Sequence, residues 1–202
     1  VEQFIASWKK NNYSINNEEL SSWWHKINEW KKIDCLSFQQ NGESIKPQYA
    51  IKRLYELTKD KNTIITTEVG QHQMWAAQYY KFEKPNKWIT SGGLGTMGFG
   101  FPAAIGAQVA HPDALVIDIA GDGSILMNIQ EMSTAVQHRL PVKIFIINNE
   151  YMGMVRQWQE LLHGGRYSES YMDSLPDFVK LAESFKVKGL RATKSIEVDD
   201  II

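Results

Sequence analysis

The chain has 202 residues, of which 43% are hydrophobic and 22% are charged, and its formal net charge is -1. This composition is typical of a globular protein and excludes a disordered or fibrous chain. Because 22 Lys and Arg residues balance 23 Asp and Glu residues, the sequence lacks the strongly basic character that nucleic acid or an anionic membrane selects, and neither partner is expected.

Residues 1–45 predict an amphipathic helix and a linker. Large apolar residues recur there at helical spacing: Leu20, Trp23, Ile27 and Trp30. Such a stripe is typical of a helix that packs on a neighbouring domain, so we expect residues 1–45 to lie outside the domain that follows. Residues 46–202 are expected to form a second domain, which opens with a helix at Pro47. Because the chain lacks an initiator Met and stops within a helix start, we expect a fragment, truncated at its C-terminus.

From residue 46 onward, apolar β-branched runs alternate with helical patterns. Strands are expected at residues 63–67, 88–90, 114–120 and 142–148, with a last short one near 188–191. Helices are expected from Gln71, after Gly98, from about Ile129 to His138, and from about Asp177. Continuous apolar runs such as 114–120 and 142–148 are typical of parallel strands that are buried on both faces. The pattern predicts an α/β fold, a three-layer open parallel sheet flanked by helices, with ligands beyond the carboxyl ends of its strands.

Two polar loops follow the third and fourth expected strands. The first loop is Gly121, Asp122, Gly123 and Ser124, and the second begins Asn148, Asn149 and Glu150. Glycines let backbone amides approach a phosphate, and the side chains of Asp122 and Asn149 offer the oxygen ligands that Mg²⁺ prefers. Their spacing of 27 positions matches one helical crossover between adjacent parallel strands. The pair predicts a metal-bridged diphosphate site.

A second glycine-rich segment offers an alternative. Gly93, Gly95 and Gly98 form a literal GxGxxG, which follows an expected strand and precedes an expected helix. Asp118 lies twenty residues beyond, as a dinucleotide-binding site requires. Asp118 falls inside its expected strand, however, where its side chain would not reach a ribose. A nucleotide-dependent oxidoreductase of the Rossmann type and a non-catalytic oligomerisation module remain alternatives to an enzyme with a metal-bridged diphosphate.

The paired loops resemble the signature of thiamine-diphosphate enzymes, and the text around them resembles the acetolactate synthases (acetohydroxyacid synthases). Residues 70–77, 91–107, 140–143 and 153–158 carry the resemblance, which covers about residues 45–202. It implies the diphosphate-type cofactor domain of a large catalytic subunit. It also implies a transferase, a carboligase that decarboxylates pyruvate and joins the remainder to pyruvate or 2-ketobutyrate in valine, leucine and isoleucine biosynthesis. A related enzyme such as pyruvate oxidase or glyoxylate carboligase is the nearest alternative.

The resemblance assigns roles to residues. Asp122 and Asn149 would bind Mg²⁺ through their side chains, and Tyr151 through its backbone carbonyl. Met97 would wedge between the two rings of the cofactor. The cofactor-binding set is Val69, Gly70, Gln71, His72, Gly95, Thr96, Met97, Gly121, Asp122, Gly123, Ser124, Asn149, Tyr151, Met152, Gly153 and Met154. Met154, Val155 and Trp158 would line the substrate channel, with Trp158 shaping the pocket for the second keto acid and contacting sulfonylurea herbicides; a core role is the alternative for Trp158.

The resemblance also implies parts that these residues lack. The family takes its essential Glu from an amino-terminal domain of the partner subunit, so we expect no catalytic residue here and no activity from this fragment alone. A homodimer or homotetramer joined through the thiamine site and a small regulatory subunit are further implications. The resemblance also implies an FAD bound mainly by a preceding central domain, of which residues 1–45 would be the last helix and linker. Residues 163–165 depart from the family, which leaves the shape of the channel open.

Overall fold

The computed structural model describes residues 1–202, which divide into two compact units, residues 1–39 and 40–202. The first unit contains α1 (Glu2–Lys10) and α2 (Asn17–Lys32). Asn16 caps α2, because its side-chain oxygen accepts hydrogen bonds from the amides of Glu18 and Glu19. The predicted helix is therefore present. No residue of α1 or α2 is buried within the chain, so the surface against which the Trp stripe would pack stays a prediction.

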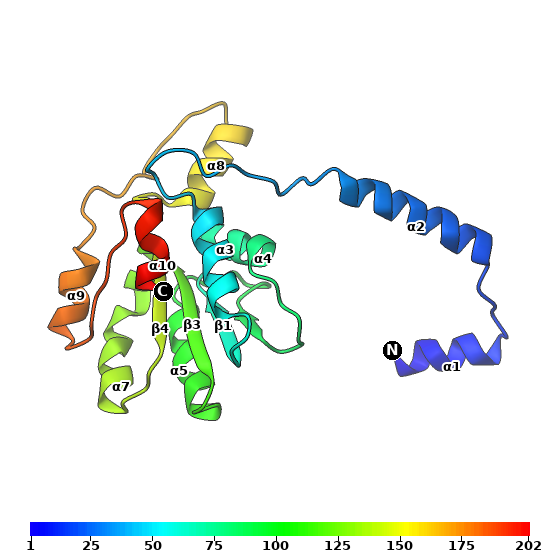
Figure 1. The fold of residues 1–202 in the computed structure, drawn as a ribbon, viewed down its shortest axis with the longest axis horizontal. Coiled ribbons are helices and arrows are strands. Elements are labelled where there is room, and N and C mark those ends of the chain that lie inside the picture. The colour runs from blue at the N-terminus through cyan, green and yellow to red at the C-terminus, as the bar shows by residue number, and fades with distance from the viewer. The chain divides into compact units, whose positions relative to one another are not determined.

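The second unit is built on four parallel strands in the order β2-β1-β3-β4 (Figure 1). The strands are β1 (Thr63–Thr67), β2 (Trp88–Thr90), β3 (Leu115–Gly121) and β4 (Lys143–Ile147). The open parallel sheet that the sequence predicts is confirmed, and the strand bounds agree to within one residue. Only the burial of β4 differs: it forms an edge of the sheet, with Lys143 exposed and the four following residues half-buried.

Helices cover both faces of this sheet. On one face, α3 (Pro47–Thr58) and α4 (Gln71–Tyr79) pack with Ile65, Ile117 and Ile119. On the other face, α5 (Gly100–Ala110) packs against Ile64 and Val116. Because successive side chains of a strand point to opposite faces, the odd-numbered residues of β1 and β3 named above pack against α3 and α4, and the even-numbered ones pack against α5. Figure 1 shows α5 and α7 beside the strands in the ribbon. No helix is both long and apolar enough to cross a membrane.

The helix expected from Ile129 is wrong at its start. The segment after β3 folds as a short helix α6 (Asp122–Ile125), a 3-10 turn η1 (Leu126–Glu131) and then α7 (Met132–Gln137). Asn128 interrupts the helix with φ -136° and ψ 29°. Its side-chain amide donates to the Gly98 carbonyl at 2.6 Å. The first three residues of the expected helix belong to the 3-10 turn η1, and the α-helix begins only at Met132.

The strand expected near residues 188–191 does not form. Residues 188–191 lie against α9 (Phe178–Ser184) instead: a Cβ added at Gly189 would stand 2.8 Å from Val179 Cα. Arg191 donates a hydrogen bond at 2.7 Å to Asp177, which caps α9. A strand needs a neighbouring edge to pair with, and this segment is held beside a helix. The remaining elements are α8 (Gly153–Leu162), η2 (Ser195–Glu197) and α10 (Val198–Ile201).

The strand order creates a natural binding crevice. From β1 the chain moves outward to β2, and it then returns across β1 to place β3 on the other side. The connections that leave β1 and β3 therefore diverge in opposite directions. Open parallel sheets bind ligands at such a switch point, beyond the carboxyl ends of the strands. Residues 68–72 and 121–124 lie at these two ends.

Candidate functional site

Asp122 joins the two polar loops that the sequence analysis paired. It follows β3 directly and is 2% exposed. One carboxylate oxygen accepts from the Gly123 amide at 2.8 Å, and the other accepts from the amides of Asn149 at 2.9 Å and Glu150 at 2.6 Å. Burial raises the pKa of the Asp122 carboxyl, while these amides oppose the rise. The predicted meeting of the two loops across β3 and β4 is confirmed.

The second polar loop is held in a defined shape. Glu150 adopts the left-handed conformation, with φ 60°. On either side of Tyr151, the Met152 amide donates to the Ser170 carbonyl at 2.8 Å and the Met172 amide donates to the Glu150 carbonyl at 2.9 Å. A Cβ at Gly123 would stand 3.0 Å from the sulfur atoms of Met152 and Met172. The absence of a side chain at Gly123 therefore allows the two loops to approach closely.

His72 connects the start of α4 to the loop after β3. A Cβ added at Gly121 would stand 2.7 Å from His72 Nδ1, so only glycine fits beside the imidazole. Burial lowers the pKa of His72 to about 4, although a hydrogen bond with the Glu68 backbone opposes the shift. The imidazole is therefore neutral at neutral pH. Its Nε2 is buried without a hydrogen-bond partner within the chain, which leaves a polar atom available at the crevice.

The depressed pKa of His72 predicts an acid-dependent loss of stability. Above its unfolded pKa of 6.5 the imidazole is neutral in both states. Below that value the unfolded chain binds a proton that the folded chain refuses, so the free energy of unfolding falls as the pH drops from 6.5 to 4. The expected loss is about 3 kcal/mol. Urea unfolding at several pH values between 4 and 7 measures this loss. We expect the free energy of unfolding of His72→Asn to depend less on pH than that of the native chain. The same pH dependence in both proteins would contradict this role of His72.

Glu68 anchors the glycine-rich segment to β1. Its carboxylate is fully buried and accepts from the amides of Gly98 at 2.6 Å and Phe101 at 2.9 Å. Burial raises the pKa of Glu68, against the effect of these amides. The loop thereby lies beside β1, where a Cβ at Gly95 would stand 3.8 Å from Val69. No role for Glu68 is predicted from the sequence. Its position directly after an apolar strand is the one sequence feature that could have marked it as a site residue.

Asp118 does not face the crevice. It lies within β3, is fully buried, and accepts a hydrogen bond at 2.8 Å from the Thr66 hydroxyl. Burial raises its pKa well above the ordinary value, and the charge of Glu68 adds to the rise. The expectation that its side chain could not reach a ribose is confirmed, which removes the main support for a dinucleotide site.

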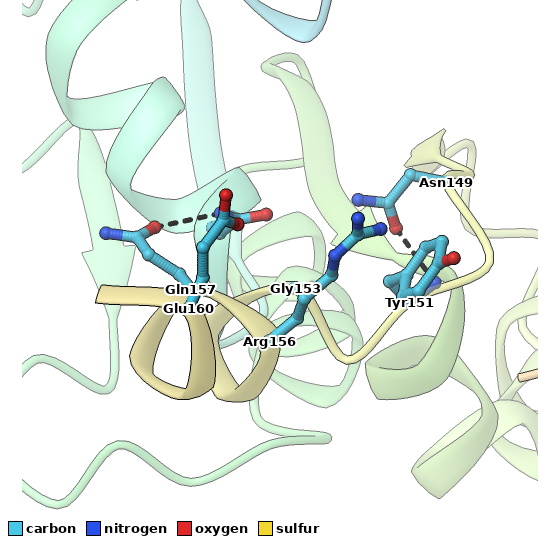
Figure 2. A pocket seen from close by; sticks show the side chains of 7 residues that line it. Asn149, Tyr151, Gly153, Arg156, Gln157 and Glu160 are labelled. Atoms are coloured by element: carbon cyan, nitrogen blue, oxygen red, sulfur yellow. Dashed lines mark hydrogen bonds between the residues drawn. The ribbon is translucent and has the colours of Figure 1, made fainter. Parts of the chain in front are cut away.

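A cavity of about 240 Å³ opens beside the second polar loop (Figure 2). It is lined by Gln71, Asn149, Tyr151, Gly153, Arg156, Gln157 and Glu160. Four of the predicted binding residues thus meet here, and Gln71 reaches α8 through a 2.8 Å hydrogen bond with the Gln157 side chain. Arg156, Gln157 and Glu160 were missed by sequence reasoning. The other predicted residues do not line this cavity: Val69, Gly70, His72, Gly95, Thr96, Met97, Gly121, Asp122, Gly123, Ser124, Met152, Met154, Val155 and Trp158.

The predicted channel residues lie on α8. Met154 is half-buried, whereas Val155 is 39% and Trp158 is 54% exposed. The alternative of a core role for Trp158 is wrong within this chain. A channel that Trp158 would line stays a prediction.

The donor set fits a magnesium ion bound together with a diphosphate. It offers one carboxylate, one side-chain amide oxygen and one backbone carbonyl, from Asp122, Asn149 and Tyr151, and the chain has no cluster of three acids, histidines or cysteines. Mg²⁺ commonly takes one or two carboxylates and completes its shell with phosphate oxygens and water. At the same edge of the sheet, the unpartnered Nε2 of His72 leaves a polar atom for a ligand.

Comparisons with known proteins agree with this site. Residues 68–202 match the family described as thiamine pyrophosphate enzyme, C-terminal TPP binding domain. The chain is 56% identical over 181 residues to the acetolactate synthase large subunit of Buchnera aphidicola from Acyrthosiphon pisum, covering 90% of this chain and 32% of the relative. The large subunit of Escherichia coli acetolactate synthase isozyme 3 is 51% identical over 182 residues, with the same coverage. The mitochondrial acetolactate synthase catalytic subunit of Saccharomyces cerevisiae is 53% identical over 186 residues, which cover 90% of this chain and 27% of that subunit.

These relatives confirm the resemblance that the sequence motifs suggested, and the chain spans about a third of the length of the curated relatives it matches. The family match covers both polar loops and the glycine-rich segment, so it assigns the GxGxxG pattern to a TPP domain and not to a dinucleotide fold. The chain belongs to the thiamine pyrophosphate enzymes, and residues 68–202 are their C-terminal TPP binding domain.

Proposed function

We propose that this chain is the cofactor-binding part of an acetolactate synthase large subunit. The whole protein would convert two pyruvate molecules into 2-acetolactate and CO₂, or pyruvate and 2-ketobutyrate into 2-aceto-2-hydroxybutyrate and CO₂. The observation that carries this choice of reaction is the identity of 51–56% to acetolactate synthase large subunits over 90% of the chain.

Within this reaction the residues would hold and orient thiamine diphosphate. When bound, the cofactor supplies an electron sink for the electron pair that CO₂ leaves behind. Asp122, Asn149 and the carbonyl of Tyr151 would hold Mg²⁺ against its diphosphate. Glu68 would fix the loop that carries Met97. The apolar side chain of Met97 would then lie beside the bound cofactor and help to preorganise it. Neutral His72 can exchange hydrogen bonds without adding a charge at this edge.

The other cofactor and the partners belong to the same proposal. Residues 1–45 would be the last helix and linker of a central domain that holds most of an FAD site. The subunit would form a homodimer or homotetramer through the thiamine site, receive its essential Glu from the partner, and bind a small regulatory subunit. The words "large subunit" in the names of several relatives support the last point. We place the protein in the cytoplasm, although the yeast relative is named mitochondrial.

Product identification in the full-length protein tests the reaction. With thiamine diphosphate, Mg²⁺, FAD and pyruvate we expect 2-acetolactate and CO₂ in equal amounts, and no activity without Mg²⁺. Formation of a two-carbon acid derivative that requires an electron acceptor would favour an oxidase of the pyruvate oxidase type. Consumption of glyoxylate in place of pyruvate would favour a glyoxylate carboligase.

A further inference from the structure

Arg156 is the only cationic residue in the wall of the cavity beside Asn149. Its guanidinium lies 4.1 Å from the centre of the Tyr151 ring and 5.5 Å from that of Tyr167. The two rings restrain this long side chain before a ligand binds. Less rotamer entropy is therefore lost when Arg156 contacts a ligand.

The charge of Arg156 is not neutralised within the chain. The ion pairs of the structure involve Arg53, Arg191, Lys194 and His25, and no carboxylate lies within 4.0 Å of Arg156. Glu160 lines the same cavity, but Figure 2 shows the Arg156 side chain directed toward Asn149 and Tyr151, whereas Glu160 lies toward Gln157. An oriented, unpaired guanidinium at a polar cavity is a ready partner for an anion.

We propose that Arg156 is a binding residue for the diphosphate of the cofactor, in addition to the predicted metal ligands. The inference rests on the proposed function, because it takes the anion at Asn149 to be that diphosphate. One Mg²⁺ leaves a diphosphate with net negative charge, and the guanidinium of Arg156 offsets the remainder. Gly153 also lies in the cavity wall, and it is the first of the ten residues of α8. The backbone amides in the first turn of a helix favour a nearby anion.

The test compares Arg156→Gln and Arg156→Lys with Arg139→Gln in the full-length protein. Arg139 is exposed after α7, so its variant changes the net charge equally without touching the cavity. Calorimetry measures the Kd of thiamine diphosphate, of inorganic pyrophosphate and of unphosphorylated thiamine, each with Mg²⁺. We expect R156Q to weaken the first two by about ten- to a hundredfold, to leave thiamine unchanged, and to be partly rescued by R156K. Melting temperatures should stay equal, since Arg156 is not in the core.

Unchanged affinity of R156Q for thiamine diphosphate and pyrophosphate would overturn the inference while the proposed function stands. If the KM for pyruvate at saturating cofactor were raised at the same time, Arg156 would be assigned to the carboxylate of the substrate. A native protein that binds pyrophosphate through Arg156 but not thiamine diphosphate would instead overturn the proposed function and keep the anion site.

Discussion

Replacing Asp122 with Ala should abolish the Mg²⁺-dependent binding of thiamine diphosphate, with a loss of affinity of about a hundredfold or more. Asp122 supplies the only carboxylate of the proposed metal site, and the same side chain accepts the amides of Asn149 and Glu150. The variant therefore loses a charged ligand and the tie that holds the second ligand loop. Calorimetric titration of the full-length protein, with and without Mg²⁺, measures the effect.

Two further variants separate charge from folding. Asp122→Asn keeps the shape, but its amide nitrogen would face backbone N–H donors, so we expect it to bind nearly as poorly as Asp122→Ala. Asp113→Ala removes an exposed acid before the opposite end of β3 and should bind like the native protein. Thermal melting checks that all three variants are folded. Native affinity in folded Asp122→Ala would refute the assignment of the metal site.

The sequence could predict the Asp122 site because its determinants are local. Each loop follows its own apolar strand, and the interval between Asp122 and Asn149 fits one crossover, so adjacency follows from chain length and parallel pairing. The sheet could be predicted for the same reason, since apolar runs mark β1 and β3 without knowledge of their neighbours. A feature whose cause lies within one βαβ unit is readable from the sequence.

The features that sequence reasoning missed depend on distant contacts. Glu68 holds Gly98 and Phe101, which lie 30 and 33 residues away, and no periodicity marks that pairing. The guanidinium of Arg156 lies near the ring of Tyr167, which comes from a loop without regular structure and is eleven residues away. Residues 188–191, expected as a short strand, are held against α9 by the close approach of Gly189 to Val179. In each case, a tertiary neighbour decides what the local pattern leaves open.

The largest effect on stability is expected at Gly100, where α5 begins. A Cβ there would overlap an Asp118 carboxylate oxygen and stand 2.5 Å from the Glu68 nitrogen and 2.6 Å from the Thr67 carbonyl carbon. These atoms belong to β3, to the last residue of β1 and to the residue that follows it; the two backbone atoms cannot move as a flexible side chain does. We expect Gly100→Ala to lower the free energy of unfolding by about 3 kcal/mol or more.

Gly106 provides the matched control on the same helix. A Cβ at Gly106 would meet nothing within 4 Å, so Gly106→Ala should leave stability unchanged or raise it by up to about 1 kcal/mol, because alanine favours the helix. Urea unfolding of both variants measures the contrast. Because the Gly100 variant would also displace Glu68, which holds Gly98, it should weaken thiamine diphosphate binding even below its melting temperature. Equal stability of the two variants would mean that α5 can withdraw from β1 and β3, and that this close contact does not position the glycine-rich loop.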